Sequence, residues 1–173
     1  DAYAISAIEI IRDNLIKAVE NGSDKKTRLA MANASLMAGV SFSNSMVGVI
    51  HAIGHSLGAV ARVPHGDAMS ILMPHCMRFN KDKLENEYAK LLYIAGEEVY
   101  VNTPKENRAD KTIEYIENML KRLNELSGLP TKLSDANVKK EDFEAIVEKA
   151  LNDGAMIVNP KQVNHDDVMK ILE

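Results

Sequence analysis

The chain is poor in several residue types that mark particular protein classes. It has one cysteine and no tryptophan in 173 residues, and its five prolines and nine glycines form no linker-like run. A single cysteine excludes an internal disulfide, and Cys76 stands among apolar residues, as expected for core packing. No apolar run reaches membrane-spanning length, and the first residues lack the pattern of a signal peptide. We therefore expect a soluble cytoplasmic protein that does not bind membranes.

An excess of positive charge is also missing. The chain has 21 Lys and Arg residues and 25 Asp and Glu residues, which gives a net charge of −4, and the basic residues are scattered along the sequence. This charge distribution makes nucleic acid an unexpected partner. The chain also has neither a Gly-x-Gly-x-x-Gly nor a phosphate-loop pattern following a strand. By itself it should not hold a dinucleotide.

The apolar residues recur every three or four positions, and no alternating strand pattern of useful length occurs. This spacing predicts an all-α domain of about eight helices over residues 1–173. The stretch 96–103 is the best candidate for a seam between two possible lobes, 1–96 and 104–173. Pro74 is expected to kink or divide its helix, whereas Thr103 and Pro104 should cap and open a long helix that ends at Gly128.

Three histidines in a glycine-punctuated stretch, residues 48–66 (GVIHAIGHSLGAVARVPHG), are the main candidates for chemistry. His51 and His55 are one helical turn apart and project from the same face. Pro64 should end that helix and deliver His65 from a second direction, near the start of the next helix. Neutral imidazoles bind Zn, Fe, Cu or Ni, so the three form a candidate metal site. The alternative is a group of hydrogen-bonded, half-buried histidines.

Longer stretches around these histidines resemble the iron-containing alcohol dehydrogenases. The resemblance is carried by about forty residues in order and continues through shorter matches in the C-terminal third. The matching segments are GVSFSN at 39–44, GVIHAIGHSLGA at 48–59, VPHGDA at 63–68, ILMPH at 71–75, MRFN at 77–80, GLP at 128–130, VKKED at 138–142, NP at 159–160 and DDV at 166–168.

The resemblance implies the helical C-terminal domain of a two-domain enzyme that interconverts alcohols and aldehydes or ketones with NAD or NADP. In that family an aspartate and three histidines hold a divalent metal, here expected to be iron, with zinc as the alternative. His51 and His65 match two of these ligands. His55 matches the histidine beside the metal and the nicotinamide, which implies a catalytic role, with support of a neighbouring ligand as the alternative.

The same resemblance places the other two ligands and the N-terminal dinucleotide-binding domain outside this chain. We therefore expect these residues to be a fragment that is inactive alone, and the full-length enzyme to be a homo-oligomer, such as a dimer, acting on a small alcohol or aldehyde. Two alternatives remain: a non-catalytic helical assembly module, and a glycerol dehydrogenase-type member of the superfamily. His75 is expected to serve packing or hydrogen bonding, and His165 to lie on the surface.

Overall fold

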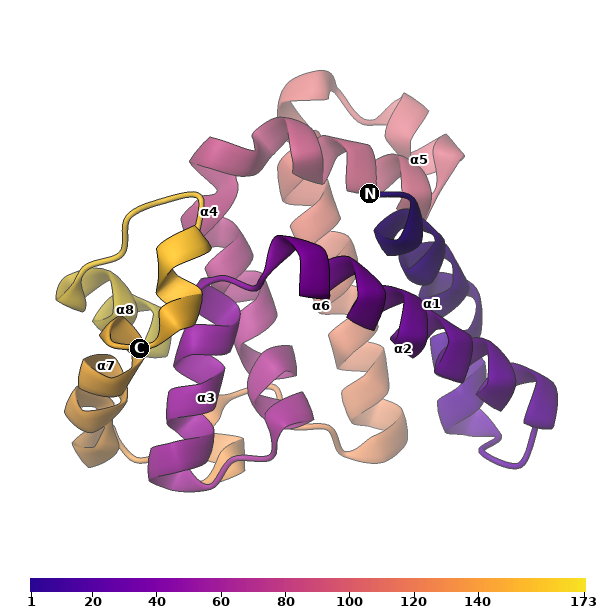
Figure 1. Cartoon of the computed structure of the whole chain (residues 1–173). Helices are drawn as coiled ribbons and strands as arrows, with labels where there is room; N and C mark the ends of the chain where they lie inside the picture. The colour runs from indigo at the N-terminus through magenta and orange to yellow at the C-terminus, as the bar shows by residue number, and fades with distance from the viewer. The chain divides into compact units, whose positions relative to one another are not determined.

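The computed structural model describes all 173 residues and contains eight α-helices, four short 3-10 helices and no strand. The predicted all-α class is thereby confirmed (Figure 1). The α-helices are α1 (Ala2–Glu20), α2 (Lys25–Ser45), α3 (Val49–Ala61), α4 (His65–Ala95), α5 (Glu97–Asn102), α6 (Arg108–Ser127), α7 (Phe143–Leu151) and α8 (His165–Leu172). The 3-10 helices are η1 (Lys105–Asn107), η2 (Leu133–Ala136), η3 (Lys140–Asp142) and η4 (Gly154–Val158).

The chain divides into two compact units, each built from two separate stretches. The first unit contains Asp1–Met46 and Glu85–Gly128, and the second contains Val47–Leu84 and Leu129–Glu173. The sequence suggested a seam at residues 96–103 instead. In the structure the boundary between the units falls within α4, which continues from one unit into the other. Leu84 has non-helical backbone angles (φ −121°, ψ 20°) and interrupts α4 at the boundary.

Two predicted helix boundaries differ in the structure. Pro74 was expected to kink or divide its helix; it lies inside α4 and does not divide it, and its neighbours Leu72 and Cys76 are buried. The Thr103 hydroxyl donates to the Val99 carbonyl of the preceding helix instead of capping a new one. The 3-10 helix η1 therefore intervenes, and α6 begins at Arg108.

The predicted end of the long helix is confirmed. Helix α6 ends at Ser127, and Gly128 follows it with a left-handed conformation at φ +74°. Its backbone N–H donates to the Asn124 carbonyl at 2.8 Å. Glycine accepts this conformation without the steric cost that a Cβ would add, which is why it ends helices so often.

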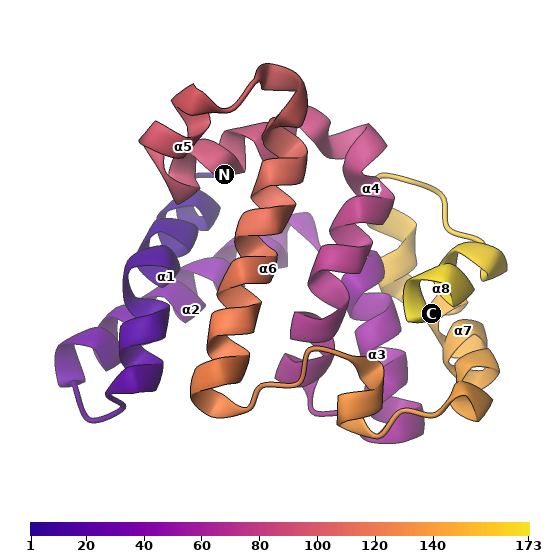
Figure 2. The same ribbon diagram turned by 180° about the vertical axis from the view of Figure 1, so that it is seen from behind.

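The first unit contains α1, α2 and α6. Helices α1 and α2 are joined by a short turn and pack against each other (Figure 2), and α1 also contacts α6. Apolar side chains in α6 and in the last part of α4, including Leu92 and Ile113, supply much of the buried surface. Helix α2 leaves several large apolar side chains exposed: Leu29, Leu36, Val40 and Phe42.

The second unit has the larger apolar core. Helix α3 packs against α7, and α7 packs against α8 (Figure 1). Fully buried side chains from these helices and from the first part of α4 meet in one cluster, which includes Ile53, Leu57, Leu72, Ile146 and Val168. Helix α3 therefore has a well-defined position, and with it the two histidines that it carries.

A pair of asparagines fixes the start of α3 within the second unit. The side chains of Asn80 and Asn159 exchange two hydrogen bonds, of 3.0 and 2.9 Å. The Asn159 Oδ1 atom also accepts from the backbone N–H of Val49 at 3.2 Å, and its Nδ2 donates to the Lys161 carbonyl at 2.7 Å. This network joins α4 and the loop after η4 to the first turn of the histidine-bearing helix.

No single helix is long and apolar enough to cross a membrane. The broken pair formed by α2 and α3 reaches the required length and composition only when the two helices are taken together.

Candidate functional site

The connection between α3 and α4 positions the third histidine. Helix α3 ends at Ala61, and Arg62 then adopts a left-handed conformation with φ 57°. The Val63 N–H donates back to the Leu57 carbonyl at 3.4 Å, and α4 begins at His65 directly after Pro64. The chain reverses within a few residues, so the predicted break at Pro64 and the predicted place of His65 are both confirmed.

The reversal brings the three histidine rings together. The His51 and His65 ring centroids are 5.5 Å apart, those of His51 and His55 are 5.8 Å apart, and those of His55 and His65 are 5.9 Å apart. His51 is half-buried, whereas His55 and His65 are exposed. Two helices therefore present three imidazoles to one small region of the second unit.

A glycine makes the close approach of these two helices possible. A Cβ atom on Gly54 would lie 1.9 Å from Cε of Met69 and 3.7 Å from Cβ of Ala68. Both neighbours belong to the first turns of α4, so Gly54 lies where α3 and α4 are nearly in contact. A residue larger than glycine at position 54 would displace the Met69 side chain, which lies one helical turn after His65.

The surroundings favour the neutral form of His51. Burial lowers its pKa, and the neighbouring His65 and His55 lower it further, while Asp153 opposes the change. A neutral imidazole has the free lone pair that a metal ion requires. The electrostatics of the cluster therefore suit ligation at His51.

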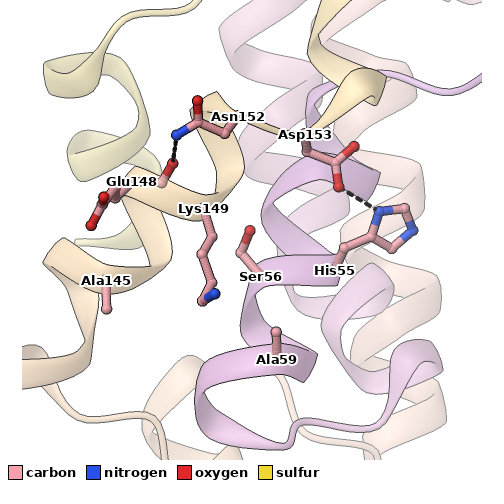
Figure 3. A pocket seen from close by; sticks show the side chains of 8 residues that line it. All are labelled: His55, Ser56, Ala59, Ala145, Glu148, Lys149, Asn152 and Asp153. Atoms are coloured by element: carbon pink, nitrogen blue, oxygen red, sulfur yellow. Dashed lines mark hydrogen bonds and ion pairs between the residues drawn. The ribbon is translucent and has the colours of Figure 1, made fainter.

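The structure adds Asp153, which the sequence analysis missed. Its Oδ2 atom lies 2.9 Å from Nδ1 of His55 (Figure 3), and its Oδ1 accepts from the Ala155 backbone N–H at 2.8 Å. Partial burial acts to raise the pKa of Asp153, but the hydrogen bonds from Ala155 and His55 lower it overall. The only available signal was the pair Asp153-Gly154 before a 3-10 turn, and it does not indicate a histidine 98 residues away.

The donor set fits part of a divalent metal site. Two imidazoles from separate helices, His51 and His65, have rings in contact range, and imidazole suits both iron and zinc. No group of three or more His, Cys, Asp or Glu side chains in the chain is arranged to hold a metal ion. These residues alone therefore do not complete a metal site.

The remaining candidates lie outside this cluster. His75 and His165 are both exposed, and His165 pairs with Glu144 at 2.8 Å. Cys76 is fully buried, and burial raises the pKa of its thiol to about 12, in agreement with a packing role. An open pocket of about 530 Å³ lies beside His55, between α3 and the segment around α7, and Lys149 and Ser56 also line it (Figure 3).

The fold and the site together define an all-α domain in which three histidines gather at one helix reversal. Residues 1–173 match the family described as "Fe-containing alcohol dehydrogenase family, C-terminal". The chain belongs to the iron-containing alcohol dehydrogenase family and corresponds to its C-terminal domain.

Individual relatives agree with this assignment. The chain is 38% identical over 171 residues to a 1,3-propanediol dehydrogenase of Citrobacter freundii, covering 99% of the chain and 43% of that protein. It is 35% identical to an NAD-dependent methanol dehydrogenase of Bacillus methanolicus, covering 100% of the chain and 44% of that protein. The alcohol dehydrogenase structure from Oenococcus oeni matches with a TM-score of 0.91 and 31% identity, covering 99% of the chain and 44% of that structure. The chain thus spans less than half the length of these relatives.

Proposed function

We propose that these residues form the metal-binding half of an NAD- or NADP-dependent alcohol dehydrogenase, which interconverts small alcohols with aldehydes or ketones by hydride transfer. The observation that carries this proposal is the meeting of His51 and His65, with ring centroids 5.5 Å apart, in a chain of this family. Their spacing follows from the helix break at Pro64, and the neutral state of His51 follows from its lowered pKa.

In the proposed site His51 and His65 would hold the metal, with iron as the first candidate and zinc as the second. A divalent metal there would supply Lewis acidity, which lowers the pKa of an alcohol. The two imidazoles fix its place because α3 is anchored in the core and α4 starts at His65. His51 is the more enclosed of the two, which limits the access of water to that side.

His55 is the proposed catalytic residue. It lies on the same face of α3 as His51 and is exposed, so its ring can reach a substrate or cofactor beside the metal. We assign it the role of orienting the alcohol and nicotinamide or of passing on the proton that the alcohol releases.

The nicotinamide cofactor would be held by the part of the enzyme that relatives have and these residues lack. The chain contains no glycine-rich dinucleotide fingerprint and only two of the proposed ligands. These 173 residues alone should therefore have no dehydrogenase activity.

The test compares this chain with the product of the complete reading frame that contains it. Both proteins are loaded with Fe²⁺ or Zn²⁺ and assayed for NAD- or NADP-linked oxidation of short primary alcohols and diols. We expect turnover by the longer product only, with His75→Ala as a control that retains activity. Failure of the metal-loaded longer product to reduce either cofactor with any alcohol would refute the proposed function, and turnover by the short chain would refute its inactivity.

A further inference from the structure

The carboxylate of Asp153 has two partners, one on each oxygen. Oδ1 caps the 3-10 helix η4 by accepting from the Ala155 N–H, and Oδ2 faces Nδ1 of His55 at 2.9 Å. Asp153 precedes η4 directly and is only partly exposed. Because the cap fixes one oxygen, the second cannot swing away from His55 without loss of the first hydrogen bond.

This contact determines which nitrogen of His55 carries the hydrogen. An ionised carboxylate can only accept hydrogen bonds, and the lowered pKa of Asp153 keeps it ionised at neutral pH. Nδ1 of a neutral His55 must therefore be the N–H that donates to Oδ2. The other nitrogen, Nε2, then has a lone pair and acts as an acceptor.

We infer that Asp153 is a positioning residue that holds His55 in its Nδ1–H tautomer and aims Nε2 at the reacting groups. The role in the reaction rests on the proposed function, whereas the tautomer rests only on the geometry. Carboxylates that orient metal-bound histidines typically change metal affinity or activity by about 10- to 100-fold when they are replaced, and we expect an effect of that size here.

The substitution Asp153→Asn separates this role from a structural one. Asparagine caps helices about as well as aspartate, so its Oδ1 can keep the hydrogen bond from Ala155. Its Nδ2 would then face His55 Nδ1 as a donor, and Nδ1 would have to accept, so the hydrogen would move to Nε2. A merely structural Asp153 would tolerate this exchange, whereas a positioning residue would not.

Asp135→Asn is the matched control. Asp135 lies in the same unit, and its Oδ2 accepts from the backbone N–H groups of Thr131 and Lys132 at 3.3 and 3.1 Å. No histidine is among its partners in these contacts. The two substitutions remove the same charge from similar backbone hydrogen bonds, so their difference reports the contact with His55.

The direct readout is the tautomer of His55, measured by ¹⁵N NMR of its ring at about pH 8.5, where neutral imidazoles dominate. We expect the Nδ1–H form in the unmodified chain and with Asp135→Asn, and the Nε2–H form with Asp153→Asn. An Nε2–H form in the unmodified chain, or an unchanged tautomer with Asp153→Asn, would overturn the inference.

The functional readout uses the metal-loaded product of the complete reading frame. For Asp153→Asn we expect kcat to fall by about 10- to 100-fold, with KM for the alcohol and the melting temperature close to those of the parent. Asp135→Asn should retain the parent's kcat. Parent-like kcat in an Asp153→Asn protein whose tautomer has changed would contradict the positioning role. If the parent itself has no activity, the proposed function fails, and the tautomer measurement alone decides the assignment of Asp153.

Discussion

Helices α2 and α3 lie close in sequence but belong to different units and have opposite environments. Helix α2 has 21 residues, of which only Thr27 and Ala34 are buried, whereas α3 has six buried residues among 13. All five histidines of the chain belong to the second unit, which contains α3. The candidate site therefore lies in the unit that contains the well-packed helix α3, whereas helix α2 of the first unit leaves several large apolar side chains exposed.

The largest expected effect contrasts one buried and one exposed residue of these helices. Ile53→Ala in α3 removes a fully buried side chain and should lower the free energy of unfolding by about 2–5 kcal/mol. Leu36→Ala in α2 shortens a side chain that is 68% exposed and should change the free energy of unfolding by less than about 0.5 kcal/mol. Denaturant unfolding of both variants measures the difference, and equal losses would contradict the contrast.

An intermediate effect is expected from the asparagine pair of the second unit. Asn159→Ala leaves the buried Asn80 amide and the Val49 N–H without their partner, which should cost about 1–3 kcal/mol. Asn152→Ala is the control, because the side chain of this exposed asparagine donates only to the Glu148 carbonyl of the preceding helix α7. A stability loss no greater for Asn159→Ala than for Asn152→Ala would show that the pair does not fix the start of α3.

The smallest effect concerns a surface histidine of the second unit. Hydrogen bonds to Glu144 and then to Asp166 raise the pKa of His165 above its ordinary value of 6.5. A raised pKa in the folded state gives stability that is present below pH 6.5 and is lost as the pH rises through the raised value. His165→Gln should therefore lower the melting temperature slightly at pH 5.5 and less at pH 8.5. Salt should reduce the difference in melting temperature between the two pH values, because His165 is exposed. A larger loss of melting temperature at pH 8.5 than at pH 5.5 would contradict the raised pKa.

Much of the helical pattern could be predicted because it follows from local rules. The break at Pro64 and the left-handed end at Gly128 depend on residues within one or two turns, and both appear in the structure. The alternative that Pro74 divides its helix was wrong; its neighbours Leu72 and Cys76 are buried, and that burial depends on distant parts of the chain, which local rules do not include.

The candidate site also combines features that local sequence predicts with a contact that it does not. The spacing of His51, His55 and His65 was visible in the sequence, and the helix reversal that gathers them could be inferred from Pro64. The partner of His55 could not be inferred, because Asp153 reaches it from the segment after α7. Tertiary packing sets that contact, and no local pattern connects residues so far apart.

The most direct test of the account is the metal content of four single variants of the complete protein: His51→Ala, His65→Ala, His75→Ala and His165→Ala. Each variant is purified after growth with iron and with zinc, and its bound metal is measured per polypeptide by mass spectrometry. The account predicts that His51→Ala and His65→Ala lose most of the metal, whereas His75→Ala and His165→Ala keep the parent's content. Parent-like metal content in both His51→Ala and His65→Ala would contradict it.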